Sequence, residues 1–324
     1  MKFLHKLLLL IFFLSFFPAC RSGSNDERII TVGREDCDYT SLREAVEAFS
    51  DDWDRIVLMD DLTIESGIDI TKEVTISGRG MKKTILAGGE TAEEAEDRIF
   101  FVKSEGRLIL EDLSVTNGRP YGLHRCGGAI ASQGFVRLER VRIADNQAVY
   151  GVGIWNEGEM EIYDSLIENN TGLRLTTAEV KDATGCTGSG GGIKNEPGGV
   201  MTIKDTTIRG NTAMRRGGGV FVSCESQTVI DNCLIEENYA SYKGGAIHVR
   251  GDLTLVNTRI VNNDSRTGYG GILNKGRLEF EDNIIKSNGK FDFALGDSES
   301  GIYGKGIVIR DENNRIGIDN RREN

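Results

Sequence analysis

The sequence predicts an all-β solenoid, in which short strands from successive coils stack in parallel along one axis. Three observations predict this fold: a period of about 25 residues, a glycine cluster in each period, and an asparagine at a fixed place in each period. The 324-residue chain contains 41 glycines, nearly twice the average usage of about 7%, but only 3 prolines. This composition argues against a disordered or collagen-like chain, and 39% of apolar residues is sufficient for a core.

Residues 1–19 have the features of a bacterial lipoprotein signal peptide. A basic start precedes the apolar run Leu7–Phe17, which is shorter than the roughly 18 residues that span a bilayer as a helix. The segment Phe17–Cys20 resembles the bacterial lipobox, and this resemblance implies that Cys20 is lipidated and becomes the mature N-terminus. The alternative is an ordinary signal peptide that is cleaved elsewhere, with Cys20 an unmodified thiol.

The predicted anchor places the protein in the bacterial cell envelope. Residues 20–28 form a short polar tether, and Arg21 in place of an aspartate favours sorting to the outer membrane. The formal net charge of −11 argues against nucleic acid as a partner. The expected contact with the membrane is therefore through the lipid anchor.

Residues 29–54 are predicted to form a strand and a capping helix. Ser41 and Glu44 have the spacing of a capping box at a helix N-terminus. One face of this helix is apolar and consists of Leu42, Ala45, Val46 and Phe49. The helix is expected to cover the core of the first coil, because the ends of a solenoid must be capped.

The repeat itself is carried by glycine and asparagine. Glycine clusters precede a branched apolar residue, which is Ile130, Ile154, Ile193, Val220, Ile247 or Ile272. An apolar residue stands three positions before each of Asn146, Asn170, Asn211, Asn238, Asn263 and Asn288. The spacings between these asparagines are 24, 41, 27, 25 and 25 residues, and the polar stretch Thr171–Ser189 accounts for the longer one.

Each period is predicted to hold three short strands, since apolar and polar residues alternate in segments such as Val136–Leu138. Glycine at the corners permits positive φ and close approach of neighbouring coils. Asparagine tolerates the left-handed conformation, and stacked amides can form a hydrogen-bonded ladder. Degenerate coils begin upstream with Val74–Gly78, so the β-helix is expected over residues 55–310, followed by a polar tail over residues 311–324.

Two resemblances follow from these segments. The segment Ser41–Ala45 resembles the CSLREA motif at the start of bacterial surface β-helix proteins, although Thr40 stands in place of its cysteine. The repeats resemble the polymorphic outer-membrane type of the pectin-lyase-like superfamily. This resemblance implies a right-handed parallel β-helix with a short N-terminal capping helix. The superfamily contains polysaccharide lyases, hydrolases and esterases as well as adhesins and surface proteins without chemistry.

Disulfides are compatible with an exported chain, but the sequence leaves their pairing open. The cysteines beyond Cys20 are Cys37, Cys126, Cys186, Cys224 and Cys233. Cys224 and Cys233 are closest in sequence, while Cys126 and Cys186 both precede glycine clusters and are expected to approach one another in a stack. An odd number leaves at least one thiol unless it pairs between chains.

A candidate ligand-binding face follows from the alternation of the strands after the glycine clusters. Two outward rows are expected, the first Ala131, Trp155, Lys194, Phe221, His248 and Leu273, the second Gln133, Glu157, Glu196, Ser223, Arg250 and Lys275. The candidate face consists of Trp155, Lys194, Glu196, Phe221, His248 and Arg250, because aromatic rings interleaved with charges can bind sugars. The alternatives are that a sheet face normally exposes some aromatic residues, or that Thr171–Ser189 covers Trp155.

The expected function is display of this surface for adhesion or for glycan or protein contact, without catalysis and without a cofactor or metal. The alternatives are a polysaccharide lyase or glycoside hydrolase acting on the outer face, and a structural spacer in the envelope. Glu157 and Glu196 could form a catalytic pair if their coils are adjacent. The few histidines and the lack of CxxC pairs argue against a metal site of the zinc type.

Overall fold

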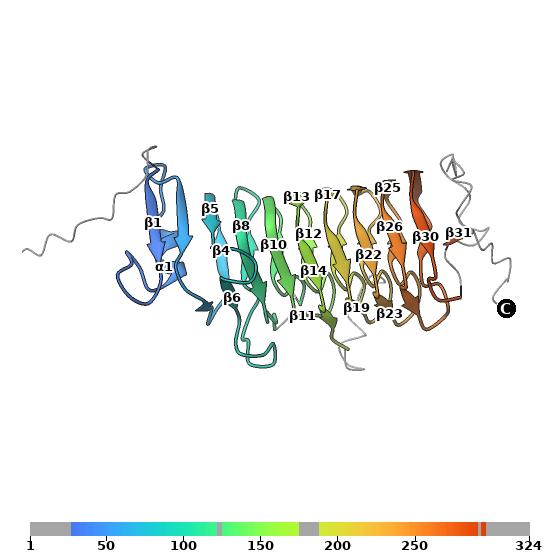
Figure 1. Cartoon of the computed structure of the whole chain (residues 1–324), viewed down its shortest axis with the longest axis horizontal. Coiled ribbons are helices and arrows are strands. Elements are labelled where there is room, and N and C mark those ends of the chain that lie inside the picture. The colour runs from blue at the N-terminus through green and yellow to red at the C-terminus, as the bar shows by residue number, and fades with distance from the viewer. Residues whose placement is uncertain (1–26, 122–124, 175–187, 291–292, 296–324) are drawn as a thin grey trace, which may run out of the picture.

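The computed structural model describes residues 27–121, 125–174, 188–290 and 293–295. In this part of the chain, β-strands stack into an elongated column, with one helix at its N-terminal end (Figure 1). Every pairing between named strands is parallel, which confirms the predicted solenoid. The predicted signal peptide, the lipobox with Cys20, and the tail of residues 311–324 lie outside the described residues.

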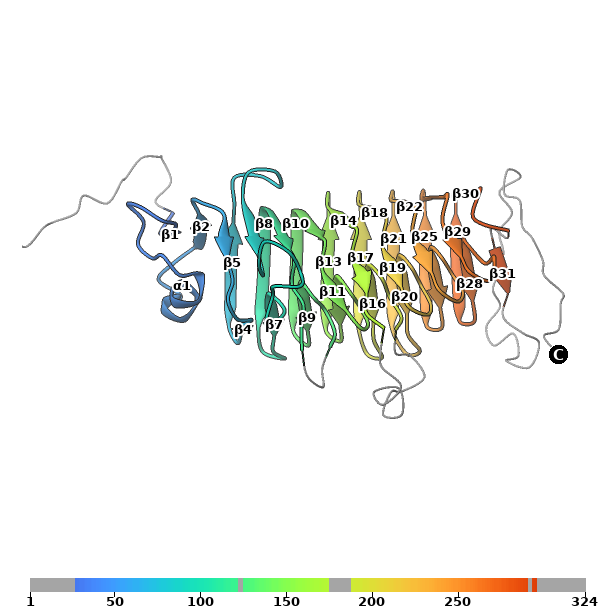
Figure 2. The same ribbon diagram turned by 90° about the horizontal axis from the view of Figure 1, so that it is seen from below.

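The strands form three sheets along the column (Figures 1 and 2). The 17-stranded sheet consists of β1 (Ile29–Val32), β2 (Arg55–Leu58), β3 (Leu62–Thr63), β5 (Glu73–Ser77), β6 (Ile85–Ala87), β8 (Arg107–Thr116), β10 (Phe135–Ala144), β13 (Glu159–Tyr163), β14 (Leu166–Glu168), β17 (Val200–Lys204), β18 (Thr207–Arg209), β21 (Gln227–Asp231), β22 (Leu234–Glu236), β25 (Asp252–Val256), β26 (Arg259–Val261), β29 (Arg277–Glu281) and β30 (Ile284–Lys286). The nine-stranded sheet consists of β4 (Ile68–Ile70), β7 (Phe100–Val102), β9 (Ile130–Ser132), β12 (Ile154–Asn156), β16 (Ile193–Asn195), β20 (Val220–Val222), β24 (Ile247–Val249), β28 (Ile272–Asn274) and β31 (Phe293–Leu295). The five-stranded sheet consists of β11 (Gln147–Ala148), β15 (Thr171–Gly172), β19 (Thr212–Ala213), β23 (Tyr239–Ala240) and β27 (Asp264–Ser265).

A regular coil therefore has four strands, not the three expected from the alternation. The strands of the five-stranded sheet have two residues each, which is too short to show a period of two in the sequence. The core lies inside the column, where the branched residues after the glycine clusters stack in register. Ile154 pairs with Ile130 on one side and with Ile193 on the other, and all three are fully buried.

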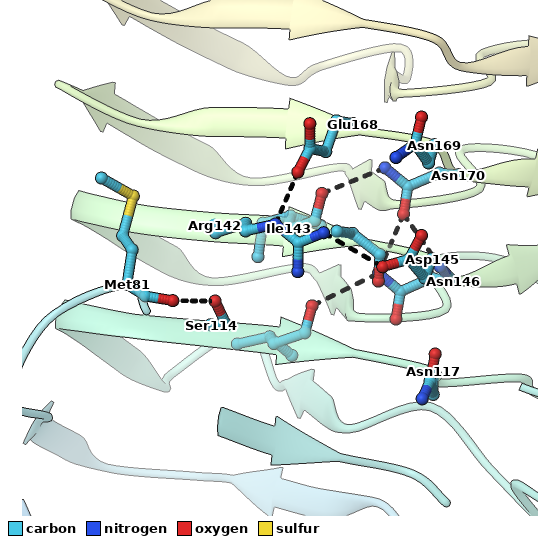
Figure 3. Close-up of polar contacts among 12 residues, drawn as sticks. Met81, Ser114, Asn117, Arg142, Ile143, Asp145, Asn146, Glu168, Asn169 and Asn170 are labelled. Carbon is cyan, nitrogen blue, oxygen red and sulfur yellow. Dashed lines mark hydrogen bonds and ion pairs between the residues drawn. The ribbon is translucent and has the colours of Figure 1, made fainter. Parts of the chain in front are cut away.

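The predicted asparagine ladder is confirmed and runs along one corner of the column (Figure 3). Asn146 Nδ2 donates to Asn170 Oδ1 at 2.9 Å, and Asn170 Nδ2 donates to Asn211 Oδ1 at 2.8 Å. The left-handed conformation, however, belongs to the preceding residue, since φ is +59° at Asp145 and +56° at Asn169. Each ladder asparagine was expected both to adopt the left-handed conformation and to form the ladder hydrogen bonds. In the structure, the asparagine forms the ladder bonds and the residue before it adopts the left-handed conformation.

The predicted capping helix is α1 (Leu42–Ala48), at the N-terminal end of the column (Figure 1). Ser41 is its N-cap, and the Ser41 hydroxyl accepts a hydrogen bond from the backbone N–H of Glu44 at 3.4 Å. The buried face consists of Leu42, Ala45 and Val46. Arg43 donates to the carbonyl of Gly67 at 2.7 Å, which fixes the helix to the loop before β4.

The structure describes Cys224 and Cys233, the pair closest in sequence, and no disulfide joins them. Cys37, Cys126, Cys224 and Cys233 are free thiols, and Cys186 lies outside the described residues. Cys224 is exposed whereas Cys233 is buried, so the pair closest in sequence occupies opposite environments. The backbone N–H of Cys233 donates to Thr258 Oγ1 at 3.2 Å, and the equivalent N–H of Ser165 donates to Thr206 Oγ1. Cys233 thus occupies a place in a second ladder of small polar residues.

Candidate binding face on the nine-stranded sheet

The two outward rows lie in register on the nine-stranded sheet, as expected. We call the first of them the strand row. It contains Ala131, Trp155, Lys194, Phe221, His248 and Leu273, which pair on neighbouring strands. The second, the rim row, follows each strand and contains Gln133, Glu157, Glu196, Ser223, Arg250 and Lys275. Backbone bonds keep it aligned, for example from Glu196 N–H to the Asn156 carbonyl and from Lys275 N–H to the Val249 carbonyl.

The expectation that the strand row faces solvent is wrong for five of its six members, because Ala131 and Leu273 are buried as well as the three residues that follow. Lys194, Phe221 and His248 are 3%, 0% and 1% exposed, respectively. Trp155 is half-buried, whereas Arg250 in the rim row is exposed. A ligand that lies along this face can therefore touch Trp155 and the accessible members of the rim row, but it does not reach the rings of Phe221 and His248 without movement of the residues above them.

The glycine turn before each strand causes this burial. Gly151, Gly190, Gly217 and Gly244 have φ between +50° and +75°, and this conformation directs the turn back against the strand that follows. A Cβ atom at Gly190 would lie 2.8 Å from the Cβ of Lys194, and one at Gly217 would lie 3.0 Å from the Cβ of Phe221. The glycines therefore supply both positive φ and close approach, as the sequence predicted, but the turn approaches the outward row.

A third row lies on these turns and was missed by the sequence analysis. We call it the cover row, and it contains Cys126, Tyr150, Ser189, Arg216, Lys243 and Tyr269, each directly before a glycine of the cluster. Cys126 and Tyr150 form a parallel bridge, and so do Arg216 and Lys243. Large or charged side chains at the same place before several glycine clusters are the signal in the sequence that could have revealed it.

Glu196 is the centre of a polar cluster on this face. Its Oε1 accepts a hydrogen bond from Trp155 Nε1 at 2.9 Å and forms an ion pair with Lys194 Nζ at 2.6 Å. Its Oε2 accepts a hydrogen bond from Ser223 Oγ at 2.9 Å. The carboxylate thus joins side chains from three successive coils, and it fixes the indole of Trp155 by its polar edge.

The buried ammonium of Lys194 lies among aromatic rings as well as beside Glu196. Its Nζ is 4.9 Å from the centre of the Tyr150 ring and 5.7 Å from that of Phe221. Burial raises the pKa of Tyr150 to about 12, and the nearby charges of Cys126 and Glu196 act in the same direction. Tyr150 therefore carries a neutral hydroxyl at neutral pH.

His248 continues the aromatic stack toward the C-terminal end. Its ring lies 5.1 Å from the Phe221 ring, with an angle of 5° between the two planes. Burial, together with the charges of Arg216, Lys275, Arg250 and Lys243, holds the pKa of His248 well below its usual value. The imidazole is therefore neutral at pH 7, although cations surround it.

The proposed catalytic pair gains no support from this geometry. Glu157 is exposed and accepts a hydrogen bond from Gln133 Nε2 at 3.0 Å, which is an ordinary surface contact. Glu196 already accepts from three donors, which are Trp155, Lys194 and Ser223. Over the described residues, no group of three or more His, Cys, Asp or Glu side chains has the arrangement of a metal site. The same part of the chain has no helix that is both long and apolar enough to cross a membrane.

Comparison with known proteins agrees with the parallel coils. Residues 97–322 match the family model of the right-handed β-helix region, which extends over more than half of the chain. No curated protein matches the chain. From the family match and the stacked parallel strands, the chain belongs to the family of right-handed β-helix proteins.

Proposed function

We propose that the protein displays the outer face of its nine-stranded sheet as a binding surface at the bacterial cell envelope, without catalysis. Contact with a glycan or protein ligand would occur at Trp155 and the rim row. The observation that carries this proposal is the cluster around Glu196, where side chains from three coils are fixed by hydrogen bonds on one face. A surface that is ordered before binding loses less conformational entropy when a ligand arrives.

Trp155 is the residue on this face that suits a sugar or an apolar side chain best. Its Nε1 is bound to Glu196, so its orientation is fixed while part of the ring remains accessible. Aromatic side chains with a fixed orientation are common anchors of binding surfaces. The exposed neighbours Gln133 and Glu157 supply polar groups for the rim of such a contact.

The binding test uses the purified full chain on arrays of glycans and of envelope or host-surface proteins. Trp155→Ala is expected to weaken binding of the ligand by about tenfold or more. Trp53→Ala is the matched control, because Trp53 is 38% exposed and lies in the N-terminal region before β2, outside the nine-stranded sheet. Equal loss in both variants, or the absence of any ligand, would contradict the proposal.

The absence of catalysis is tested with the same ligands. Hydrolysis would produce reducing ends, and a lyase reaction would produce an unsaturated sugar with ultraviolet absorbance. We expect neither product from any bound glycan. Turnover that is lost in Glu196→Gln but retained in Glu157→Gln would identify the protein as an enzyme.

We also propose that Cys20 carries the lipid that holds the protein to the outer membrane. The support is the lipobox-like segment before Cys20 and the polar tether after it. Metabolic labelling with a fatty acid is expected for the wild-type chain and not for Cys20→Ser. Labelling that persists in Cys20→Ser would place the lipid elsewhere.

A further inference from the structure

A buried histidine, His248, occupies a place in the strand row that its neighbours fill with apolar side chains. It pairs with Phe221 on β20 and with Leu273 on β28. Phe221, His248 and Leu273 are 0%, 1% and 3% exposed, respectively. Because phenylalanine and leucine fill the equivalent places on the two adjacent coils, packing alone does not require a histidine here.

The imidazole of His248 suits this place as a neutral ring. Its plane makes an angle of 5° with that of Phe221, and the ring centres are 5.1 Å apart, so it packs as an aromatic side chain. Among the described residues, its Nδ1 is buried without a hydrogen-bond partner. Burial of an unpartnered polar atom is unfavourable, and burial of a charged ring costs considerably more. What the histidine adds to an apolar side chain is therefore the ability to take up a proton.

Positive charges face His248 from the neighbouring turns and strand ends. Arg216 and Lys243 lie on the turns before β20 and β24, while Arg250 and Lys275 follow β24 and β28. Burial is the main cause that holds the pKa of His248 well below its usual value of 6.5, and the four positive charges act in the same direction. Since burial is the largest cause, the direction of this shift does not depend on whether the cations have partners of their own.

Two tyrosines and one carboxylate are the other titratable groups considered at this place. The rings of Tyr242 and Tyr269 lie 5.1 Å and 5.0 Å from Lys243 Nζ. Tyrosine hydroxyls gain no charge when the pH falls. The carboxylate of Glu196 lies two coils from His248 and already accepts from three donors. Protonation of the buried imidazole is therefore opposed both by burial and by the charges that act on it.

The turn before β24 covers His248. A Cβ atom at Gly244 would lie 3.2 Å from the Cβ of His248, so this turn lies directly against the histidine. Backbone hydrogen bonds hold the turn to both adjacent coils. The N–H of Gly244 donates to the carbonyl of Tyr269 at 2.9 Å, and the N–H of Gly217 donates to the carbonyl of Lys243 at 3.2 Å. Hydration of a protonated imidazole requires movement of this turn, so protonation and opening are linked.

We infer that His248 is an acid-sensitive switch that opens the turn before β24 when the pH falls from neutral to mildly acidic values. In the closed form the imidazole is buried and neutral, and in the open form it is hydrated and carries a proton. Opening also uncovers the ring of Phe221, which is fully buried at neutral pH. The strands on either side of the turn are expected to remain paired.

The size of the switch follows from proton linkage. The open form has the usual histidine pKa of 6.5 and the closed form a much lower one, so only the open form takes up a proton as the pH falls below 6.5. The ratio of open to closed form therefore rises about tenfold for each pH unit below that value. Between pH 7.5 and 5.0 the expected increase is about thirtyfold.

Hydrogen–deuterium exchange of the full chain, measured by mass spectrometry and corrected for intrinsic exchange rates, tests this inference. Peptides over residues 241–249 should lose about thirtyfold in protection between pH 7.5 and 5.0. This loss should disappear in His248→Leu and in His248→Phe, which place the side chains of Leu273 and Phe221 at the equivalent position. Two apolar variants are used so that failure of one to fold leaves the test intact.

The matched control is His124→Gln, which removes the other histidine beyond the predicted signal peptide. It should keep the wild-type pH dependence. The same loss of protection in the wild type and in the apolar variants would overturn the inference. Loss of protection along the whole column at pH 5.0 would also overturn it, because the change would then be general unfolding. The measurement needs no ligand, so its outcome is independent of the proposed binding function.

Discussion

Replacement of Glu196 by glutamine tests whether the polar cluster around it on the nine-stranded sheet is organised as described. The substitution keeps the shape of the side chain but removes the negative charge beside Lys194 Nζ, 2.6 Å away. It also places an amide N–H₂ group where the carboxylate now accepts hydrogen bonds from Trp155 or Ser223. At least one of these donors then loses its acceptor.

The size of the effect follows from burial of the ion pair. The side chains of Lys194 and Glu196 are 4% and 14% exposed. Removal of one partner from a buried pair costs about 3–5 kcal/mol, because a buried charge remains without compensation. Since Glu196 is partly accessible, we expect the lower end of this range, about 3 kcal/mol in the free energy of unfolding.

Urea denaturation followed by the fluorescence of Trp155 measures this loss locally. Trp53→Phe provides the background, since Trp53 and Trp155 are the two tryptophans of the chain. Lys194→Met combined with Glu196→Gln should recover part of the stability, because the buried charge is gone. Glu157→Gln, at the exposed equivalent position one coil away, should change stability by less than about 0.5 kcal/mol. A loss in Glu196→Gln as small as that of Glu157→Gln would refute this description of the cluster.

Three further predictions concern the column and its surface. Asn211→Leu removes four side-chain hydrogen bonds of the ladder and should lower the free energy of unfolding by about 4 kcal/mol in urea denaturation. Burial raises the pKa of Cys233 to about 12, so a thiol reagent should label exposed Cys224 and leave Cys233 unmodified in the native protein, as mass spectrometry would show. Burial alone would raise the pKa of Glu168, but hydrogen bonds from two arginines outweigh it and hold that pKa below its usual range. Glu168 therefore stabilises the fold above the unfolded-state pKa, and its advantage over Glu168→Gln should shrink as pH falls from about 5 to 3.

Each of these predictions has its own control. Asn274→Val should cost less than about 1 kcal/mol, because valine occupies the equivalent place at Val249, and a loss as large as that of Asn211→Leu would contradict the ladder argument. Cys233→Thr should be tolerated, because Thr258 already occupies the same place one coil later. Labelling of Cys233 in the native protein as fast as that of Cys224 would contradict the thiol prediction. A stability difference between the wild type and Glu168→Gln that does not depend on pH would contradict the prediction for Glu168.

The fold could be predicted because its determinants repeat. A glycine cluster and an asparagine at near-constant spacing determine the length of a coil, so the register of Ile154 with Ile130 and Ile193 follows from counting. The number of strands in a coil could not be predicted in the same way. The two-residue strand Gln147–Ala148 is defined by backbone pairing between coils, which leaves no pattern in the side chains.

The alignment of the outward rows could be predicted, but their exposure could not. Alternation correctly placed Lys194 and His248 on the outside of the strands. It could not show that the turn before each strand approaches the same side, since this depends on the φ angle of a glycine such as Gly190. The residue before the glycine differs in type from coil to coil, for example Cys126 in one coil and Lys243 in another. These positions therefore lack the repeated apolar residue that identifies a core position.

The emission of Trp155 during titration with a bound glycan tests the central claim most directly. That claim is that ligands contact the outer face of the nine-stranded sheet. In the Trp53→Phe protein, we predict a saturable change in Trp155 emission with the same dissociation constant that calorimetry gives. Calorimetric binding of the glycan without any change in Trp155 emission would contradict the account, because the ligand would then lie on another face of the column.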